Sequence, residues 1–338
     1  MQILRKIPGL VLLPRLFKRL LRRVPGLVFL YHSCRLVHLL RRTNNFRYVY
    51  PACPPGSYYS PLPDYKEVLA RSQELFDQDS VDIPGVNLRE EAQLELLNDF
   101  SSYYSDLTFP RLPTEGRRYY SENNMFPYAD AISLYGVMCK YGPRRVVEIG
   151  SGFSSAAMLD VNDLFLRTEV NFTFIEPFPD RLLGLLRRED MTTCTILQNQ
   201  VQDIPLEIFQ ALSANDILFI DSSHVVKIGS DVGHILFKIL PELKAGVIVH
   251  FHDIYWPFEY PREWILRGVA WNEAYFVRLF LLNNDAFEIM YFNSFMAKRH
   301  ADVLRKRMPL GLKVSQQALE GSGPSSLWLK KVAKVKET

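Results

Sequence analysis

The stretch Arg145-Val-Val-Glu-Ile-Gly-Ser-Gly-Phe-Ser-Ser155 predicts a short buried strand over 145–149, then a tight Gly-Ser-Gly turn and the beginning of a helix. Gly150 and Gly152 have no Cβ, so the backbone N–H groups at the start of that helix can approach a ligand closely. The turn therefore indicates a site for a nucleotide-like ligand. The alternative is that it only connects a strand to a helix, because short glycine motifs also occur by chance.

Strands and helices alternate downstream of this turn, which indicates βαβ units and a parallel sheet covered on both faces. A change of pattern near the C-terminus suggests an antiparallel strand within that sheet. The predicted fold class is a Rossmann-like, doubly wound α/β domain with a mostly parallel seven-stranded sheet. The predicted strands are 145–149, 171–176, 194–198, 216–221, 246–252, 287–292 and 326–332. The predicted helices are 90–104, 127–140, 154–166, 179–188, 204–212, 231–240 and 267–282.

The charge is spread unevenly along the 338 residues, whose net charge is +3. Residues 1–63 contain eleven Lys or Arg and no Asp or Glu. Within residues 1–42, leucines at helical spacing among these cations favour an amphipathic arm that contacts an anionic membrane surface. A helix that docks on a partner protein, or a mis-assigned start, are the alternatives. Aromatic residues and cations do not form a pattern for nucleic-acid binding, so we expect no nucleic-acid partner.

The remaining chain is expected to comprise a connector, a main domain and a tail. Residues 43–117 are predicted to be a Pro- and Tyr-rich connector with a helical cover, residues 118–333 the domain that contains the sheet, and residues 334–338 a tail. The longest uncharged run, 24–34, is too short to span a bilayer, and no secretory cleavage signal follows it. Four cysteines without paired spacing fit a reducing compartment. We expect a cytoplasmic protein, with peripheral contact at the inner face of the membrane as a further expectation.

Polar residues follow several predicted strands at the end where ligands bind in such sheets. The glycine turn follows the first strand, Glu176 ends the second, Asp221-Ser-Ser-His224 follows the fourth, and His252-Asp253 follows the fifth. We therefore expect these groups to converge. A carboxylate 26 residues after Gly150 can accept hydrogen bonds from ribose hydroxyls. The third glycine of a dinucleotide motif is absent, which favours a cofactor without a pyrophosphate.

As a set, Val146–Ser155, Phe174-Ile-Glu176 and Asp216–Asp221 resemble a class I S-adenosylmethionine-dependent methyltransferase. The family's last glycine is replaced here by Ser154. The resemblance implies that the turn faces the methionine part of the cofactor and that Glu176 faces the ribose. The implied cofactor-binding residues are Glu148, Gly150, Ser151, Gly152, Ser154, Glu176 and, near the adenine, Gln202.

A narrower resemblance concerns the residues after the fourth and fifth strands, which are similar to those of metal-dependent sugar O-methyltransferases. It implies that Asp221 and Asp253 bind a divalent metal and that His224 is the general base. His252 stands where those enzymes have an acid, and imidazole suits transition metals better than Mg²⁺. The implied metal set is thus Asp221, His252 and Asp253, and the implied catalytic pair is Asp221 and His224.

The chemistry agrees with this assignment, because a hydroxyl must lose its proton before it can attack a methyl group. The implied acceptor is a small molecule or glycan, such as a sugar or a related natural product. Trp256, Tyr260, Trp264 and Trp271 are either a wall of the acceptor site or ordinary core. A catalytically silent binding protein of the same fold and a nicotinamide-dependent oxidoreductase are the two alternatives. The sequence is compatible with an oligomer.

Overall fold

The computed structural model describes residues 53–76, 82–166 and 170–332. The predicted arm over 1–42 and the tail over 334–338 therefore lie outside the described residues. The chain divides into two compact units, of which the second, residues 69–338, contains the sheet. None of the helices in the described part of the chain is both long and apolar enough to cross a membrane.

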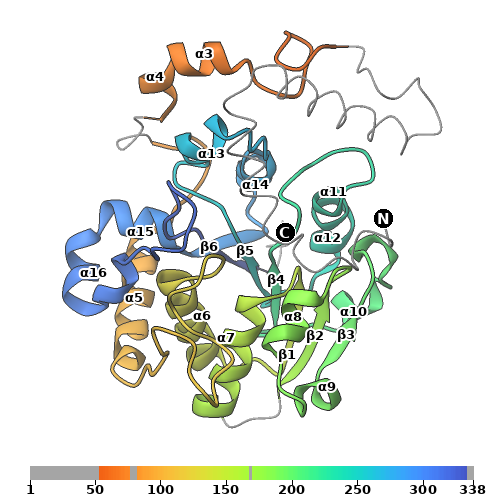
Figure 1. Ribbon diagram of the computed structural model, residues 1–338, viewed down its shortest axis with the longest axis vertical. Helices are drawn as coiled ribbons and strands as arrows, with labels where there is room; N and C mark the ends of the chain where they lie inside the picture. The colour runs from red at the N-terminus through yellow and green to blue at the C-terminus, as the bar shows by residue number, and fades with distance from the viewer. Residues whose placement is uncertain (1–52, 77–81, 167–169, 333–338) are drawn as a thin grey trace, which may run out of the picture. The chain divides into compact units, whose positions relative to one another are not determined.

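The second unit is built on one sheet with the strand order β3-β2-β1-β4-β5-β7-β6 (Figure 1). The strands β1 to β5 pair in parallel, whereas β7 is antiparallel to both of its neighbours, β5 and β6. The predicted doubly wound sheet with one antiparallel strand is confirmed. The strands are β1 (Arg145–Ile149), β2 (Asn171–Ile175), β3 (Thr195–Leu197), β4 (Ile217–Ile220), β5 (Ile248–Phe251), β6 (Phe287–Phe292) and β7 (Leu327–Lys331).

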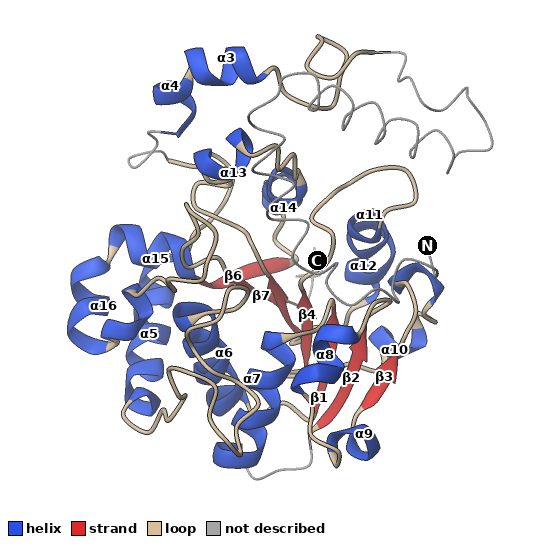
Figure 2. Cartoon of the chain, in the orientation of Figure 1, coloured by secondary structure: helices blue, strands red, loops and turns tan. Residues whose placement is uncertain are grey.

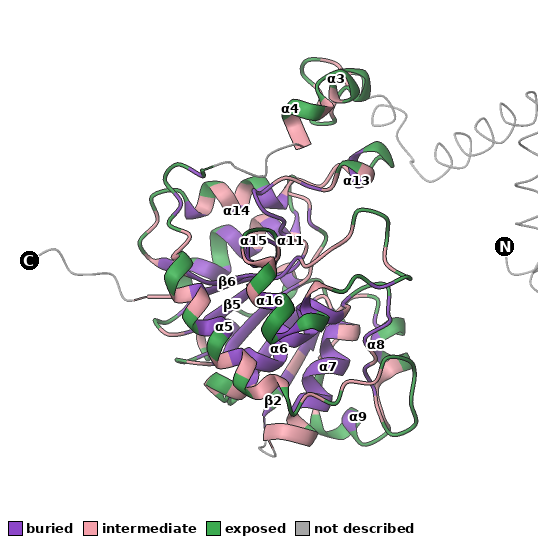
Figure 3. Ribbon diagram, turned by 90° about the vertical axis from the view of Figure 1, so that its left-hand side faces the viewer, coloured by how far each residue is buried: buried purple, intermediate pink, exposed green. Residues whose placement is uncertain are grey.

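Helices cover both faces of this sheet, as the alternation of strands and helices predicts (Figure 2). Figure 3 shows the buried strands between the layer of α6 and α7 and the layer that contains α11 and α14. The described helices are α3 (Tyr65–Ala70), α4 (Ser72–Phe76), α5 (Glu90–Tyr104), α6 (Tyr128–Tyr141), α7 (Phe153–Val161), α8 (Asp180–Leu185), α9 (Asp190–Thr193), α10 (Glu207–Gln210), α11 (Asp231–His234), α12 (Leu240–Glu242), α13 (Arg262–Leu266), α14 (Glu273–Leu281), α15 (Asn293–Arg299) and α16 (Ala301–Arg307).

One predicted helix, 267–282, is wrong in its first third. Gly268 adopts a left-handed φ of 86° and ends α13, and α14 begins only at Glu273. The loop between the two helices is fixed by Asn272, whose side chain accepts from Val226 N at 2.6 Å and donates to its carbonyl at 3.2 Å. These bonds, which no local pattern reveals, place the loop beside the end of β4.

Gly150 is the residue that ties the centre of the sheet to the turn. Its N–H donates to Ile175 O of β2 at 3.0 Å, and Asp221 N beyond β4 donates to Ile149 O at 2.8 Å. Gly150 has a φ of +81°, and a Cβ there would lie 1.7 Å from the carbonyl oxygen of Asp221. Only glycine therefore fits where the ends of β1 and β4 meet, which is the point at which the strand order reverses.

Candidate active site

The carboxylate of Glu148 bonds to the residues that follow the glycine turn. It is fully buried, and its two oxygens accept hydrogen bonds from the hydroxyls of Ser154, at 2.5 Å, and Ser155. The Ser155 hydroxyl also accepts from Gly152 N at 3.0 Å. Burial raises the pKa of Glu148 to about 8. The serine in the place of the family's last glycine thus bonds to Glu148, and the two predicted cofactor-binding residues form one structural unit.

Glu176 supports the same turn from the end of β2. Its carboxylate accepts from Ser151 N at 3.1 Å and from Phe178 N at 2.8 Å. The hydroxyl of Ser151 is buried and has no hydrogen-bond partner among the described residues, and the same holds for Ser222 after β4. Two unsatisfied hydroxyls at the point where the strand order reverses fit a polar ligand there. The amide of Gln202 donates to Gly229 O at 2.8 Å and so holds the loop that follows β4.

Four ionisable side chains converge beyond β4 and β5, as the sequence predicts: Asp221, His224, His252 and Asp253. Asp221 Oδ1 lies 3.3 Å from His224 Nε2 and 3.6 Å from His252 Nδ1. The carboxylate of Asp253 lies 3.8 Å from His224 Nε2 and 3.6 Å from His252 Nδ1. His224 and Asp253 both adopt a left-handed φ, of 59° and 54°. Such backbone strain in non-glycine residues is concentrated at functional sites.

His224 has a second carboxylate partner that the sequence did not suggest. Its Nδ1 lies 2.8 Å from Glu273 Oε2 at the start of α14. Burial alone would lower the pKa of His224, but the hydrogen bonds to Asp221 and Glu273 raise it to about 10. The imidazole therefore holds its proton at neutral pH. The ring of Trp271 packs against it at 4.3 Å between centroids.

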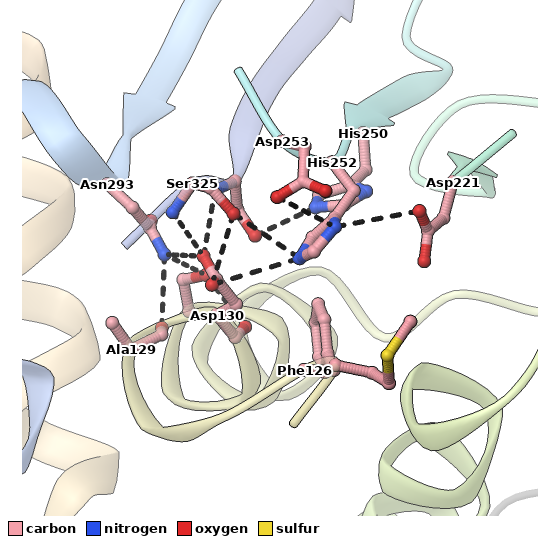
Figure 4. Close-up of polar contacts among 12 residues, drawn as sticks. Phe126, Ala129, Asp130, Asp221, His250, His252, Asp253, Asn293 and Ser325 are labelled. Carbon is pink, nitrogen blue, oxygen red and sulfur yellow. Dashed lines mark hydrogen bonds and ion pairs between the residues drawn. The ribbon is translucent and has the colours of Figure 1, made fainter. Parts of the chain in front are cut away.

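His252 is linked to a second buried acid that was missed, Asp130 of α6 (Figure 4). Asp130 Oδ1 accepts from Ser325 N, Ser326 N and Asn293 Nδ2 at 3.0, 2.8 and 2.9 Å, and its Oδ2 lies 3.9 Å from His252 Nε2. This network fixes the start of β7 to α6 beside the site. Both missed acids come from helices and carry no motif, so only the tertiary structure identifies them.

His250, which precedes His252 by two residues on β5, belongs to the core. It stacks on Phe219 at 3.7 Å between ring centroids, and its Nε2 lies 2.9 Å from Ser326 Oγ. Burial holds its pKa well below the ordinary value, so the ring is neutral.

The converging groups do not fit the predicted divalent metal. Within residues 53–76, 82–166 and 170–332, no group of three or more His, Cys, Asp or Glu side chains is arranged to hold an ion. Each carboxylate faces ring nitrogens instead. Burial would lower the pKa of His252, but Asp253 and Asp221 raise it well above the ordinary value. In this arrangement His252 is the counter-ion of Asp221 and Asp253, where the resemblance implied a metal ligand.

A cavity of about 150 Å³ opens beside Asp130, His252 and Asp253. Trp264 and Trp271 line it, whereas Trp256 and Tyr260 line a different cavity. Of the four aromatic residues considered for an acceptor wall, the structure thus places two at this site. Residues 313–325 form another part of its lining. Glu122 anchors that segment, because its carboxylate accepts from Ser315 Oγ at 3.0 Å and from Gln316 N.

This chain is similar to several known proteins. A family model described as a methyltransferase domain matches residues 147–254. An uncharacterised protein of Archaeoglobus fulgidus is 35% identical over 169 residues, which are 48% of this chain and 75% of that protein. Among solved structures, a methyltransferase of Podospora anserina bound to S-adenosylhomocysteine is 13% identical, with a TM-score of 0.38 over 80% of this chain and 98% of that one. An O-methyltransferase of Streptomyces achromogenes in complex with S-adenosylmethionine is also 13% identical, with a TM-score of 0.37 over 79% and 96% of the two chains.

Proposed function

Since this chain belongs to the class I S-adenosylmethionine-dependent methyltransferases, we propose that it methylates a hydroxyl group of a small organic acceptor. The observation that carries the proposal is the convergence of Asp221, His224 and Asp253 beyond β4 and β5, next to the glycine turn, with Asp253 also lining the cavity. The narrower resemblance implies a sugar or related natural product as that acceptor. The proposed reaction uses no divalent metal, because within the described residues the side chains that converge here are not arranged to hold one.

The residues at the point of strand reversal would hold the cofactor, whose sulfonium group supplies an electrophilic methyl. The unsatisfied hydroxyls of Ser151 and Ser222 would meet its polar groups, and the carboxylate of Glu176 would accept from its ribose hydroxyls. The distinction between cofactor and acceptor sites follows from the fold. The turn after β1 takes one ligand, and the cavity beside β5 takes the other.

Methyl transfer forms a bond from the acceptor oxygen to the methyl carbon and breaks the bond from that carbon to sulfur. The hydroxyl must give up its proton for the oxygen to attack, and His224 Nε2 is the acceptor that we propose for that proton. Glu273 at Nδ1 fixes the tautomer and the ring orientation, so that Nε2 is the nitrogen that exchanges a proton. Because the imidazole of His224 is protonated at neutral pH, Nε2 can accept the proton of the hydroxyl only after its own proton has left.

Calorimetry with S-adenosylhomocysteine and transfer of a labelled methyl group test the proposal. We expect the wild-type protein to bind S-adenosylhomocysteine and not a nicotinamide dinucleotide. Glu176→Gln should weaken that binding about tenfold or more, because a hydrogen bond to a charged group contributes about 1.5–3 kcal/mol. The exposed Asp180, at the start of α8, gives the control Asp180→Asn, which should bind as the wild type does.

Each outcome of that experiment has a separate meaning. No binding at millimolar S-adenosylhomocysteine would contradict the methyltransferase assignment. Binding without transfer to any hydroxylated acceptor would favour the catalytically silent alternative. Rates measured with and without a chelator are expected to agree. A loss of turnover with the chelator would show that a divalent metal takes part.

The base assignment predicts an alkaline pH dependence. Because His224 has a raised pKa of about 10, its neutral fraction grows as the pH rises towards that value. We expect kcat/KM to increase roughly tenfold per pH unit above neutrality and to level off near the pKa of His224. His224→Ala should abolish this rise while S-adenosylhomocysteine still binds, and His234→Ala on α11 should leave the profile unchanged. A flat profile in the wild type would refute the assignment.

A further inference from the structure

The cavity beside Asp253 has the size of a single ring. Its volume is about 150 Å³, and an apolar protein cavity of about that size holds one benzene molecule. Asp253 and His252 line it together with residues of α13 and of the loop that follows. Trp271 lines the cavity and also packs on the ring of His224. Trp271 and Asp253, which both line the cavity, are thus the two residues through which a ring there would be linked to His224.

Aromatic side chains form one wall of this cavity in an edge-to-face arrangement. The rings of Trp264 and Trp271 lie 5.4 Å apart with an interplanar angle of 89°, and those of Trp264 and Tyr255 lie 5.5 Å apart at 82°. Aromatic rings prefer such contacts, and a planar ligand ring can extend the same packing. Tyr255 also donates from its hydroxyl to Asp253 at 3.4 Å, so the aromatic wall extends as far as the carboxylate of Asp253.

The rest of the lining is mixed. Met125, Val314, Leu319 and Pro324 contribute apolar surface, and Asn124, Lys313 and Ser322 contribute polar side chains. The buried acid of the lining, Asp130, already accepts hydrogen bonds from two backbone N–H groups and an asparagine. A sugar carries a hydroxyl on most of its ring carbons, and each one left without a partner in such a place costs about 1–3 kcal/mol. An aromatic ring with few oxygens avoids that cost.

One polar atom of the wall lacks a partner. Trp264 is 5% exposed, and its Nε1–H makes no hydrogen bond among the described residues. Buried donors are almost always satisfied, and Trp264 lines the cavity, so we assign a partner for this donor to the ligand. The indole can only donate, and its partner must therefore be an oxygen or nitrogen with a lone pair.

We infer that the acceptor is a single aromatic ring that carries the reacting hydroxyl and, elsewhere on the ring, an oxygen or nitrogen that accepts from Trp264 Nε1. This inference rests on the proposed function and names its substrate class. It replaces the sugar that the resemblance implied with a phenolic ring. The hydroxyl would lie at the corner of Asp253 and His252, and the ring would pack against Trp264 and Trp271.

Two matched variants test this inference. Trp264→Phe keeps an aromatic ring and removes the indole N–H. Trp256→Phe is the control, because Trp256 is likewise buried with an unsatisfied Nε1 but lines the other cavity. The probes are catechol, its monomethyl ether and methyl glucoside. Each is titrated into protein saturated with S-adenosylhomocysteine and, separately, supplied as acceptor for a labelled methyl group.

We expect catechol to bind at least tenfold more tightly than methyl glucoside and to be methylated. Trp264→Phe should weaken catechol binding about threefold to tenfold, the range for one hydrogen bond, and Trp256→Phe should change it less than twofold. Tighter binding of the glucoside, binding of no phenolic probe, or equal effects of the two variants would overturn the inference. S-adenosylhomocysteine binding to the same samples distinguishes a wrong acceptor class from a wrong proposed function. If it persists, only the acceptor class is wrong, and if it is absent, the proposed function fails first.

Discussion

Gly150→Ala is expected to abolish cofactor binding and to destabilise the domain by more than about 4 kcal/mol. A Cβ at this position would lie 1.7 Å from the carbonyl oxygen of Asp221 and 2.7 Å from its carbonyl carbon. Both are backbone atoms, so no side-chain rotation can relieve the clash. The two central strands would have to separate, and the turn and the acid that follows β4 would move with them. Denaturant unfolding and S-adenosylhomocysteine calorimetry measure the two effects.

Gly142→Ala is the matched control for this variant. Gly142 also has a left-handed φ, of +53°, and follows α6 at the C-cap, but a Cβ there would meet no heavy atom within 4 Å. It should therefore lose only about 1 kcal/mol, the cost of a left-handed conformation for an alanine. If Gly150→Ala unfolded at the same denaturant concentration as Gly142→Ala, the close approach of β1 and β4 would not be real.

Arg118→Met is expected to cost about 3–5 kcal/mol, because it leaves buried carboxylates without a counter-ion. The guanidinium is 3% exposed and donates to Asp190 with two nitrogens, at 2.7 and 2.5 Å. It also donates to Asp160 at 2.9 Å and to Asp163 at 2.7 Å. Asp160 and Asp190 are themselves almost fully buried. Arg118 is the buried cation that contacts all three carboxylates, and water cannot replace it at this buried position.

Arg187→Met provides the comparison, since Arg187 contacts Asp163 at 3.1 Å and Asp160 at 3.7 Å but is 32% exposed. Exposed ion pairs contribute little, and we expect a loss below about 1 kcal/mol. Unfolding in denaturant at neutral pH measures both variants. Equal losses would show that burial of Arg118 does not determine its contribution. S-adenosylhomocysteine affinity should also fall in Arg118→Met, because the backbone at 118–119 donates to Asp160 of α7 and the adjacent Tyr120 packs against Phe153, next to the glycine turn.

The sequence predicted the sheet well, because the strands are short buried runs and parallel strands place their carboxyl ends together. The sequence alone therefore assigns Asp221 and Asp253 to one site, where the structure places both of them near His224. Their partners Glu273 and Asp130 could not be assigned in this way, because each acid lies on a helix far from these strands in sequence. The loop before α14 was missed for a related reason. The apolar spacing of 267–282 suits a helix. The left-handed Gly268 and the contacts of the loop with the chain after β4 keep the first residues of this range out of a helix.

The place of β7 in the sheet has a consequence for how the chain folds. This strand, Leu327–Lys331, is the last to be synthesised, yet it fills the position between β5 and β6. Until β7 is made, β5 and β6 each lack β7 as a pairing neighbour, and both expose an open strand edge to the surroundings. The corner at Asp130 is also incomplete, since Ser325 and Ser326 arrive with β7. These strand edges therefore remain exposed to aggregation and proteolysis until β7 is in place, and the hydrogen bonds of Asp130 to Ser325 and Ser326 form with it.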